Sequence, residues 1–327
     1  MNSRALLSGA ILAGSIYSAN ADAFDTTLYY TRYSGSPNVR KVDVSFDGSL
    51  FSVSSPVDVG TTFGADGIVG NPQNSDLLIV GGQGTTINTI DRNTGFVIPY
   101  ATPVPAFHLA VPTSDTLLAS GIPGSLARHA ILPGGAIGPG SLITVDQGSV
   151  TTIIPAPGGQ YYFTDAGSSG NGDFGKITFD AAIDTATSAT TALIASGVIS
   201  AHGGAYDPFS NTILLFGGGE ISQWTLAGTL LGSRTFSATF DQGAVDGAGH
   251  LFVASNGGEL LMIDYEGDGQ VYNPSNPTYF QFLDSFLDDI APLIGEGGTN
   301  PVPEPSTVFG GLALAGLCLS RAFKRKK

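Results

Sequence analysis

The segment His202–Trp224, HGGAYDPFSNTILLFGGGEISQW, holds three short apolar runs separated by turn residues. The first run, His202–Ala205, opens with a polar residue and leads into Asp207–Asn211, where Asp, Pro, Ser and Asn favour a tight turn. Ile213–Phe216 has the length and branching of a buried strand, and a third run ends at Trp224. Three strands joined by two turns therefore fit into 23 residues.

This unit recurs along the chain at spacings of 38 to 52 residues. The middle runs are Leu28–Tyr30, Leu77–Val80, Leu117–Ala119, Tyr161–Phe163, Ile213–Phe216 and Leu251–Val253. Most are preceded by a polar-led run, as in Asp66–Val69, His108–Val111, His202–Ala205 and Asp241–Ala244. Another apolar run, often ending in Asp, follows most of them, although Leu126–Leu132 fits this pattern poorly.

Units of about 45 residues with four short strands are typical of β-propeller blades. Six units fit the chain, and we predict an all-β, six-bladed propeller over residues 24–298. The first middle run has no polar-led strand before it, whereas Asp289–Pro292 resembles one, so strands from both ends should close the ring. In pattern alone, the body resembles the NHL, YVTN and quinoprotein-like propeller families. A pair of β-sandwiches and a parallel β-helix are the competing interpretations.

The polar residues that open the innermost strands should face one mouth of a central channel. They are Asp66, His108, Thr151, His202, Asp241 and Asp289. Imidazole and carboxylate groups around an axis could bind a divalent cation such as calcium, with Asp66, His108, His202, Asp241 and Asp289 as metal ligands, and the cation could activate water. The alternative is that these groups cap strand ends and bind neighbouring loops or water.

Other residues that could bind a metal or act in catalysis give weaker evidence of a functional site. Asp264–Gly269 resembles the first half of a calcium loop, but Ser275 occupies the position of the closing glutamate, so an acidic turn is the preferred interpretation. His129 and His250 have no cysteine or carboxylate cluster beside them in the sequence, and we interpret them as ordinary surface or core residues. We found no Gly-x-Ser-x-Gly, His-Glu-x-x-His or paired Cys-x-x-Cys motif, which argues against the commonest hydrolases and names no catalytic residue.

Residues 1–23 have the features of a secretory signal peptide. Arg4 precedes an apolar stretch that is too short to span a bilayer comfortably, and small-x-small triplets close the segment at Ala21 and Ala23. A retained N-terminal anchor is the alternative.

The other end of the chain has three parts. A Pro-rich segment, 299–306, precedes a predicted transmembrane helix, 307–323, and 324–327 is basic. The uncharged apolar stretch 307–320, together with Phe323, is just long enough to cross a thin bilayer as a helix. Val302–Ser306, this helix and the basic end resemble the PEP-CTERM sorting signal, with Pro303, Glu304 and Pro305 as the motif. That resemblance implies that signal peptidase and exosortase process the chain, and that the C-terminal helix holds it in the inner membrane of a Gram-negative bacterium before release. The alternative is an ordinary tail anchor that follows a Pro-rich linker by chance.

The charge of the body limits its partners. The chain has a net charge of −14, and residues 24–298 carry 7 basic against 25 acidic residues, which excludes nucleic-acid binding. The resemblance to sorted proteins implies a cell-surface or extracellular-matrix location among exopolysaccharide in a biofilm. Our leading hypothesis is a non-enzymatic binding or scaffolding propeller, with polysaccharide as a candidate partner. The alternative is an exported metal-dependent hydrolase, lactonase-like or glycan-cleaving, with its site at the channel mouth.

Overall fold

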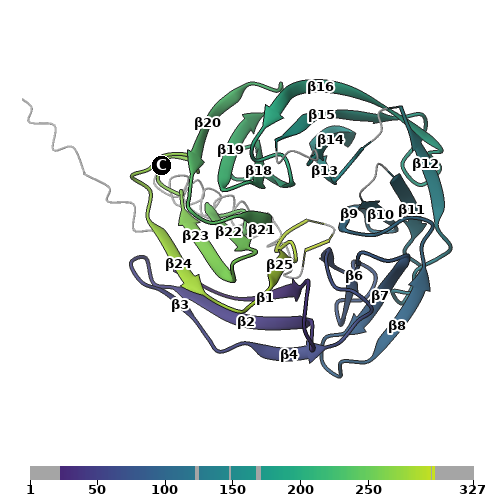
Figure 1. Ribbon diagram of the computed structural model, residues 1–327, viewed down its shortest axis with the longest axis horizontal. Coiled ribbons are helices and arrows are strands. Elements are labelled where there is room, and N and C mark those ends of the chain that lie inside the picture. Colours follow the sequence, from purple (N-terminus) through teal and green to yellow (C-terminus); the bar gives the residue numbers. More distant parts are fainter. Residues whose placement is uncertain (1–22, 122–124, 147–148, 167–170, 296, 299–327) are drawn as a thin grey trace, which may run out of the picture.

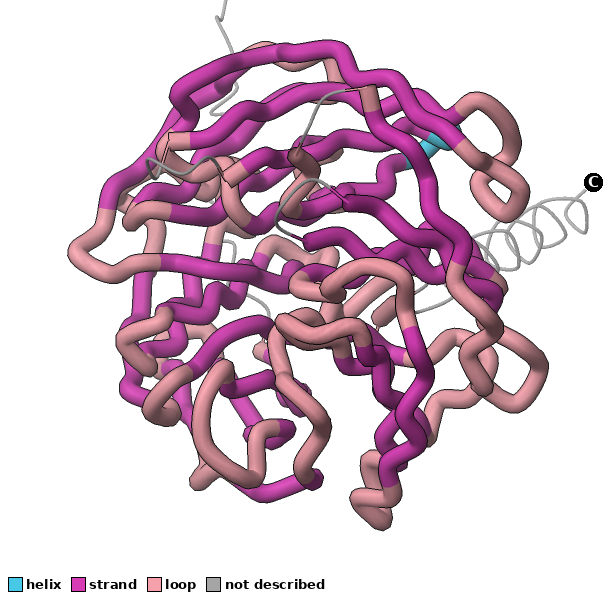
Figure 2. Tube along the Cα trace, turned by 45° about the vertical axis from the view of Figure 1, so that its right-hand side comes forward, coloured by secondary structure: helices cyan, strands magenta, loops and turns pink. Residues whose placement is uncertain are grey.

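The computed structural model describes residues 23–121, 125–146, 149–166, 171–295 and 297–298. These residues form 25 β-strands and one short 3₁₀ turn, η1 (Pro157–Gly159). The strands curve around a common axis in a ring (Figure 1), and the rest of the described chain is almost entirely loop (Figure 2). The fold is therefore all-β, as the scarcity of helix-forming sequence predicts.

The strands fall into six consecutive groups. The first group contains β25 (Leu287–Ile290), β1 (Phe24–Arg32), β2 (Val39–Phe46), β3 (Phe51–Val53) and β4 (Val57–Gly60). The second contains β5 (Ile68–Gly70), β6 (Leu77–Val80), β7 (Thr86–Asp91) and β8 (Val97–Ala101). The third contains β9 (His108–Thr113), β10 (Thr116–Gly121), β11 (Ser125–Ala130) and β12 (Ser141–Val145). The fourth group contains β13 (Thr152–Ala156), β14 (Gln160–Asp165), β15 (Gly172–Phe179) and β16 (Ser188–Val198). The fifth contains β17 (Gly203–Asp207), β18 (Thr212–Gly217), β19 (Glu220–Thr225) and β20 (Leu230–Thr235). The sixth contains β21 (Phe240–Val245), β22 (His250–Ser255), β23 (Glu259–Asp264) and β24 (Thr278–Phe282).

Each group is one blade of a six-bladed propeller. Within a blade, successive strands pair antiparallel from the axis outward. The innermost strands β5, β9, β13, β17, β21 and β25 are neighbours in that order and return to β5, so they surround the axis of the ring (Figure 1) and line a central channel. The repeat seen in the sequence is therefore the blade, and the predicted middle runs are its second strands.

The two ends of the described chain close the ring, as predicted. β25 supplies the innermost strand of the first blade by pairing antiparallel with β1, where Tyr30 lies opposite Ile290. Beyond β25, the Ala291 amide donates to the Tyr29 carbonyl at 2.9 Å. Closure by strands from both ends protects the inner strand edges from pairing with other chains.

The third and fourth blades are joined at the rim. β12 runs parallel to β16, with Thr144 opposite Ser188 and Val145 opposite Ala189. This pairing makes one continuous eight-stranded sheet of the two blades.

The core lies mostly between blades, where apolar side chains of adjacent sheets interdigitate. One such layer joins Leu118 of the third blade to Phe163 of the fourth, and another joins Phe216 of the fifth to Val253 of the sixth. Some neighbouring blades approach so closely that only glycine fits: at Gly81, which follows β6, an added Cβ would overlap the carbonyl oxygen of Ala106, which precedes β9 of the next blade. Inter-blade packing is thus close along the channel wall.

The poor fit of Leu126–Leu132 to the repeat was misleading. Ser125–Ala130 forms β11, a regular strand that pairs with β10 over six residues. Its apolar periodicity is broken by a buried polar residue, His129, whose ring is satisfied by hydrogen bonds.

The predicted signal peptide, sorting motif and tail helix lie outside the described residues. Within the described part of the chain, none of the helical structure is long and apolar enough to cross a bilayer.

Candidate functional site

The inner ends of five blades bring buried polar side chains together on the propeller axis. Asp66, His108, His202, Asp241 and Asp289, which the sequence predicted as candidate ligands, all belong to this cluster, and Asp288 joins them. We call the six residues the axial cluster. All except His202 are at least nine-tenths buried.

The axial cluster has an imidazole half, formed by His108, His202 and Asp241. One ligand atom from each lies within 4.8 Å of the other two. His202 Nε2 is 2.8 Å from Asp241 Oδ1, and the rings of His108 and His202 meet edge to face at 5.2 Å. The His202 side chain is 34% exposed, so solvent reaches this half of the cluster.

The carboxylate half consists of Asp66, Asp288 and Asp289, whose oxygen atoms also lie within 4.8 Å of one another. Asp288 and Asp289 are adjacent in β25, and Asp66 lies just before β5. The halves meet where His108 Nδ1 lies 3.4 Å from Asp289 Oδ2. The carboxylate half thus depends on ring closure, because the C-terminal strand brings two of its three residues.

Thr31 holds the carboxylate half in position. Its hydroxyl donates to the Asp66 carbonyl at 2.5 Å and accepts from the Asp289 amide at 3.1 Å. Thr31 is fully buried in β1. Nothing in its sequence neighbourhood marks this role, because it depends on three distant segments meeting.

Burial and mutual repulsion oppose ionisation of the carboxylate half. Desolvation, followed by the charges of neighbouring aspartates, raises the pKa of Asp66 to about 8 and the pKa of Asp288 to about 12. The same two causes raise the pKa of Asp289 well above its ordinary value. Burial also acts against ionisation of Asp241, but the nearby His202 and His108 outweigh it and lower its pKa to about 2.

Several buried ligand atoms in the axial cluster have no hydrogen-bond partner. They are His108 Nδ1, Asp288 Oδ2 and Asp289 Oδ1. An unsatisfied buried polar atom costs about 1–3 kcal/mol, so their convergence needs an explanation. A bound divalent cation would satisfy these atoms and allow the carboxylates to ionise, and the donor set fits one.

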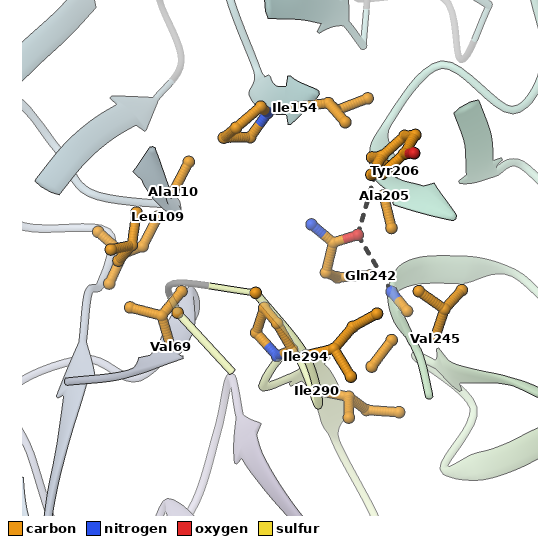
Figure 3. A pocket seen from close by; sticks show the side chains of 18 of the residues that line it. Val69, Leu109, Ala110, Ile154, Ala205, Tyr206, Gln242, Val245, Ile290 and Ile294 are labelled. Carbon is orange, nitrogen blue, oxygen red and sulfur yellow. Dashed lines mark hydrogen bonds between the residues drawn. The ribbon is translucent and has the colours of Figure 1, made fainter. Parts of the chain in front are cut away.

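The channel continues beyond the cluster as an apolar cavity of about 650 Å³. Side chains such as Val69, Leu109, Ile154 and Ile290 line it, and Asp289 belongs to both the cavity wall and the cluster (Figure 3). Gln242 is one of the polar residues that line the cavity. Its Oε1 accepts from the Gly204 and Gly243 amides at 3.0 and 3.1 Å, so its side-chain amide nitrogen points into the open space (Figure 3).

Thr151 does not contribute to the cluster, although it opens the fourth blade as the sequence suggested. It is fully buried, its carbonyl accepts from the Ser120 hydroxyl at 2.7 Å, and its own hydroxyl accepts from the Ala166 amide at 2.8 Å. Thr151 therefore ties the third blade to the fourth. Asp288 was the residue that sequence reasoning missed, and its one signal was the Asp288–Asp289 pair at the start of the closing strand.

The Asp264–Gly269 segment is a turn stabilised by its own hydrogen bonds. The Asp268 carboxylate accepts from the side-chain amides of Asn273 and Asn276 at 2.6 and 2.9 Å. These contacts support the interpretation as an acidic turn over the calcium-loop alternative.

Comparisons with solved structures agree with this architecture. The chain is similar to a calcium-binding protein, regucalcin, from Agrobacterium tumefaciens, with a TM-score of 0.51 and 12% identity over 76% of this chain and 86% of that one. It is also similar to a protein from Lactobacillus plantarum, with a TM-score of 0.50 and 11% identity over 80% and 83% of the two chains. At these identities the likeness shows the propeller fold alone. No protein-family model matches the chain, and neither does any curated protein.

Proposed function

We propose that this chain is an exported surface protein whose propeller binds a divalent cation in the axial cluster. The observation that carries the proposal is the convergence of four buried carboxylates and two imidazoles, several of whose atoms lack hydrogen-bond partners. Without a cation, desolvation and repulsion oppose the charge that Asp66, Asp288 and Asp289 would carry at neutral pH.

The two halves of the cluster differ in the ions that they suit. Asp66, Asp288 and Asp289 offer oxygen atoms only, which calcium prefers, whereas His108 and His202 add nitrogen donors that suit zinc or manganese. The similar regucalcin structure is described as a calcium-binding protein, and this supports testing calcium first. The strongly acidic body adds a long-range attraction for cations.

Metal analysis of the full chain, purified in mild detergent, tests the cation. After chelator treatment, we expect calorimetric titration with calcium, zinc and manganese to find one ion bound at the axis. His202→Ala and Asp241→Asn should weaken binding at least tenfold, because each removes a ligand. Asp184 is an exposed aspartate between β15 and β16 and does not belong to the axial cluster. Asp184→Asn is therefore the matched control and should bind the ion as the wild type does. Equal binding by all three variants would refute the axial site.

The sorting part of the proposal rests on the C-terminal residues. A proline fixes its own backbone torsion and favours extended neighbours, so Pro303 and Pro305 would present Glu304 to exosortase on a stiff handle next to the apolar stretch 307–320. Replacing Pro303, Glu304 and Pro305 together with alanine should leave the tail attached in an exosortase-positive host, as measured by intact mass. Pro301→Ala lies outside the motif and should be processed normally. Normal tail removal from the triple variant would refute this assignment.

For the body outside the cell, we propose a scaffold that binds polysaccharide. Its support is the excess of acidic residues in the body, 25 against 7 basic ones, which could attach to acidic glycan through a bridging cation. Pull-down of the full chain with the host's exopolysaccharide, with and without chelator, should show binding only while the cation is present.

A metal-dependent hydrolase is the second candidate. It is favoured by the set of two histidines and one aspartate, a three-ligand arrangement typical of catalytic metals with an open position. The apolar cavity that shares Asp289 with the cluster would receive the substrate. Turnover of lactones or aryl esters by the metal-loaded chain, lost in His202→Ala and kept in Asp184→Asn, would favour this function. A stoichiometric ion without turnover would favour the scaffold.

A further inference from the structure

A second group of ligand-type side chains lies on the sixth blade, outside the axial cluster. His250 begins β22 and pairs across the ladder with Asp264 at the end of β23. Glu266 follows two residues later, and its amide donates to Asp264 Oδ1 at 3.2 Å. A ring nitrogen of His250 and one carboxylate oxygen each of Asp264 and Glu266 lie within 4.8 Å of one another. We call these three residues the rim site.

The His250 ring is fixed in orientation by Asp246. Its Nδ1 lies 2.6 Å from Asp246 Oδ2, and Asp246 Oδ1 accepts from the His250 amide at 3.0 Å and the Ala248 amide at 2.8 Å. Because Asp246 is held by the backbone, it sets the tautomer with the proton on Nδ1. The ring's other nitrogen, Nε2, is then left as the atom that can bind an ion.

Nε2 of His250 is buried without a hydrogen-bond partner. The residue is 1% exposed, and the rings of Phe24 and Phe46 from the first blade pack against the imidazole at 4.7 and 5.8 Å. An unpaired buried donor or acceptor costs about 1–3 kcal/mol. A ligand on Nε2 removes the deficit.

The arrangement matches the way in which proteins present a histidine to a metal. Ligating histidines almost always donate their second ring N–H to a carboxylate, which fixes the ring and raises its basicity. Asp246 occupies that place, and Asp264 and Glu266 supply oxygen donors. A nitrogen with two carboxylates suits zinc rather than calcium, which takes oxygen ligands.

We propose that the rim site binds a zinc-type divalent cation through His250, Asp264 and Glu266, with Asp246 positioning the imidazole. The cation would connect the turn after β21, the start of β22 and the end of β23, close to where Phe24 and Phe46 join the first blade to the sixth. It would therefore stabilise the seam at which the ring closes. This proposal is independent of the cation proposed for the axis.

The probe is zinc alone. It is titrated into the full chain carrying His202→Ala, a variant that lacks one ligand of the axial cluster. We expect His202→Ala to retain one zinc ion per chain in calorimetric titration and elemental analysis, with a raised melting temperature. His202→Ala with His250→Gln should lose that ion and the shift. Asp246→Asn in the same background should keep the stoichiometry but weaken affinity by about 10–100-fold. The exposed Asp184→Asn is the matched control for the loss of one carboxylate charge.

Nitrogen NMR of labelled histidine gives a readout that does not need the His250 variant to fold. The chain has four histidines, and zinc should shift the Nε2 resonance of His250 while leaving that of His129 unchanged. The proposal is overturned if His202→Ala binds no zinc, if the double variant binds as much as His202→Ala, or if the His250 resonance does not respond. Failure of the axial site alone would give one ion in the wild type and none in His250→Gln.

Discussion

The Tyr30 hydroxyl donates to Asp284 Oδ2 at 2.9 Å, joining the first strand to the loop that precedes the last one. Arg40 Nη1 lies 2.6 Å from the same oxygen, and Arg32 Nε lies 3.3 Å from Asp284 Oδ1. The carboxylate is 8% exposed. Burial and the Asp284 hydrogen bond raise the pKa of Tyr30, so the phenol stays a donor. One buried carboxylate thus fastens three residues of the first blade at the ring seam.

Asp284→Asn should lower the free energy of unfolding by about 3–5 kcal/mol, because it leaves two arginine side chains without their buried counter-charge. Urea denaturation of the full chain measures the loss. Asp58→Asn is the matched control, since Asp58 pairs with the same Arg40 at 2.7 Å but is 55% exposed. Its cost should stay below about 1 kcal/mol. Equal costs for the two variants would contradict this account of the seam.

Gly81→Ala should destabilise the protein by about 1–3 kcal/mol or more, because the new methyl group would overlap the Ala106 carbonyl and force two neighbouring blades apart. Gly84, three residues later, has no atom within 4 Å of the place that an added methyl group would take, and it lies outside the left-handed region. Gly84→Ala should therefore be neutral or raise stability by up to about 1 kcal/mol. Thermal melts of the pair check the prediction, which is wrong if the two variants melt together.

The metal-free protein should lose stability through Asp66 as the pH rises from about 4 to 8. The pKa of Asp66 is about 8 in the folded chain against 3.8 for an ordinary aspartate, so in this window the folded state keeps a proton that the unfolded state releases. The free energy of unfolding then falls by up to about 1.4 kcal/mol per pH unit. Denaturation series in chelator should show that Asp66→Asn makes this slope shallower, while Asp288 and Asp289, whose pKa values are also raised, keep their own contributions. A divalent cation should stabilise the wild type most near pH 8, and an unchanged slope in the variant would contradict the prediction.

His129 should have the opposite effect at acid pH. Its Nδ1 lies 3.0 Å from the Gly138 carbonyl and its Nε2 3.0 Å from the Thr102 hydroxyl, and burial lowers its pKa below 6.5. Below pH 6.5 the unfolded state binds a proton that the folded state does not bind. The free energy of unfolding therefore falls by up to about 1.4 kcal/mol for each unit by which the pH is lowered. NMR titration should place the midpoint of this imidazole below 6.5. His129→Gln should lose the acid-side slope, and a midpoint above 6.5 would contradict the assignment.

The propeller could be predicted from sequence because its blades repeat. Each second strand is apolar on both faces, so runs such as Leu77–Val80 and Ile213–Phe216 stand out, and both are strands with these bounds or within one residue of them. Closure by Asp289–Pro292 was also predictable, since a ring with one missing inner strand needs another segment to fill it. The strand itself begins earlier, at Leu287, so that Asp288 is also brought to the axial cluster.

The candidate site was only partly predictable. Position within the repeat located Asp66, His108, His202, Asp241 and Asp289, because equivalent strand starts meet on the axis. It also selected Thr151, whose hydroxyl and carbonyl instead bind neighbouring segments, since the repeat places the backbone but not the side-chain contacts. The rim site and the Asp284 contacts escaped prediction altogether. Both join residues whose proximity depends on how the sixth blade packs against the first.

The parallel pairing of β12 with β16 has a consequence for how the ring comes apart. Elsewhere in the described chain, each sheet is confined to one blade, but here strand pairing continues from one blade into the next. Residues of these two blades should therefore exchange their amide hydrogens as a single cooperative unit, while other blades can open separately. The six blades are therefore not equivalent in how they can open, because the third and fourth are joined at the rim by paired strands.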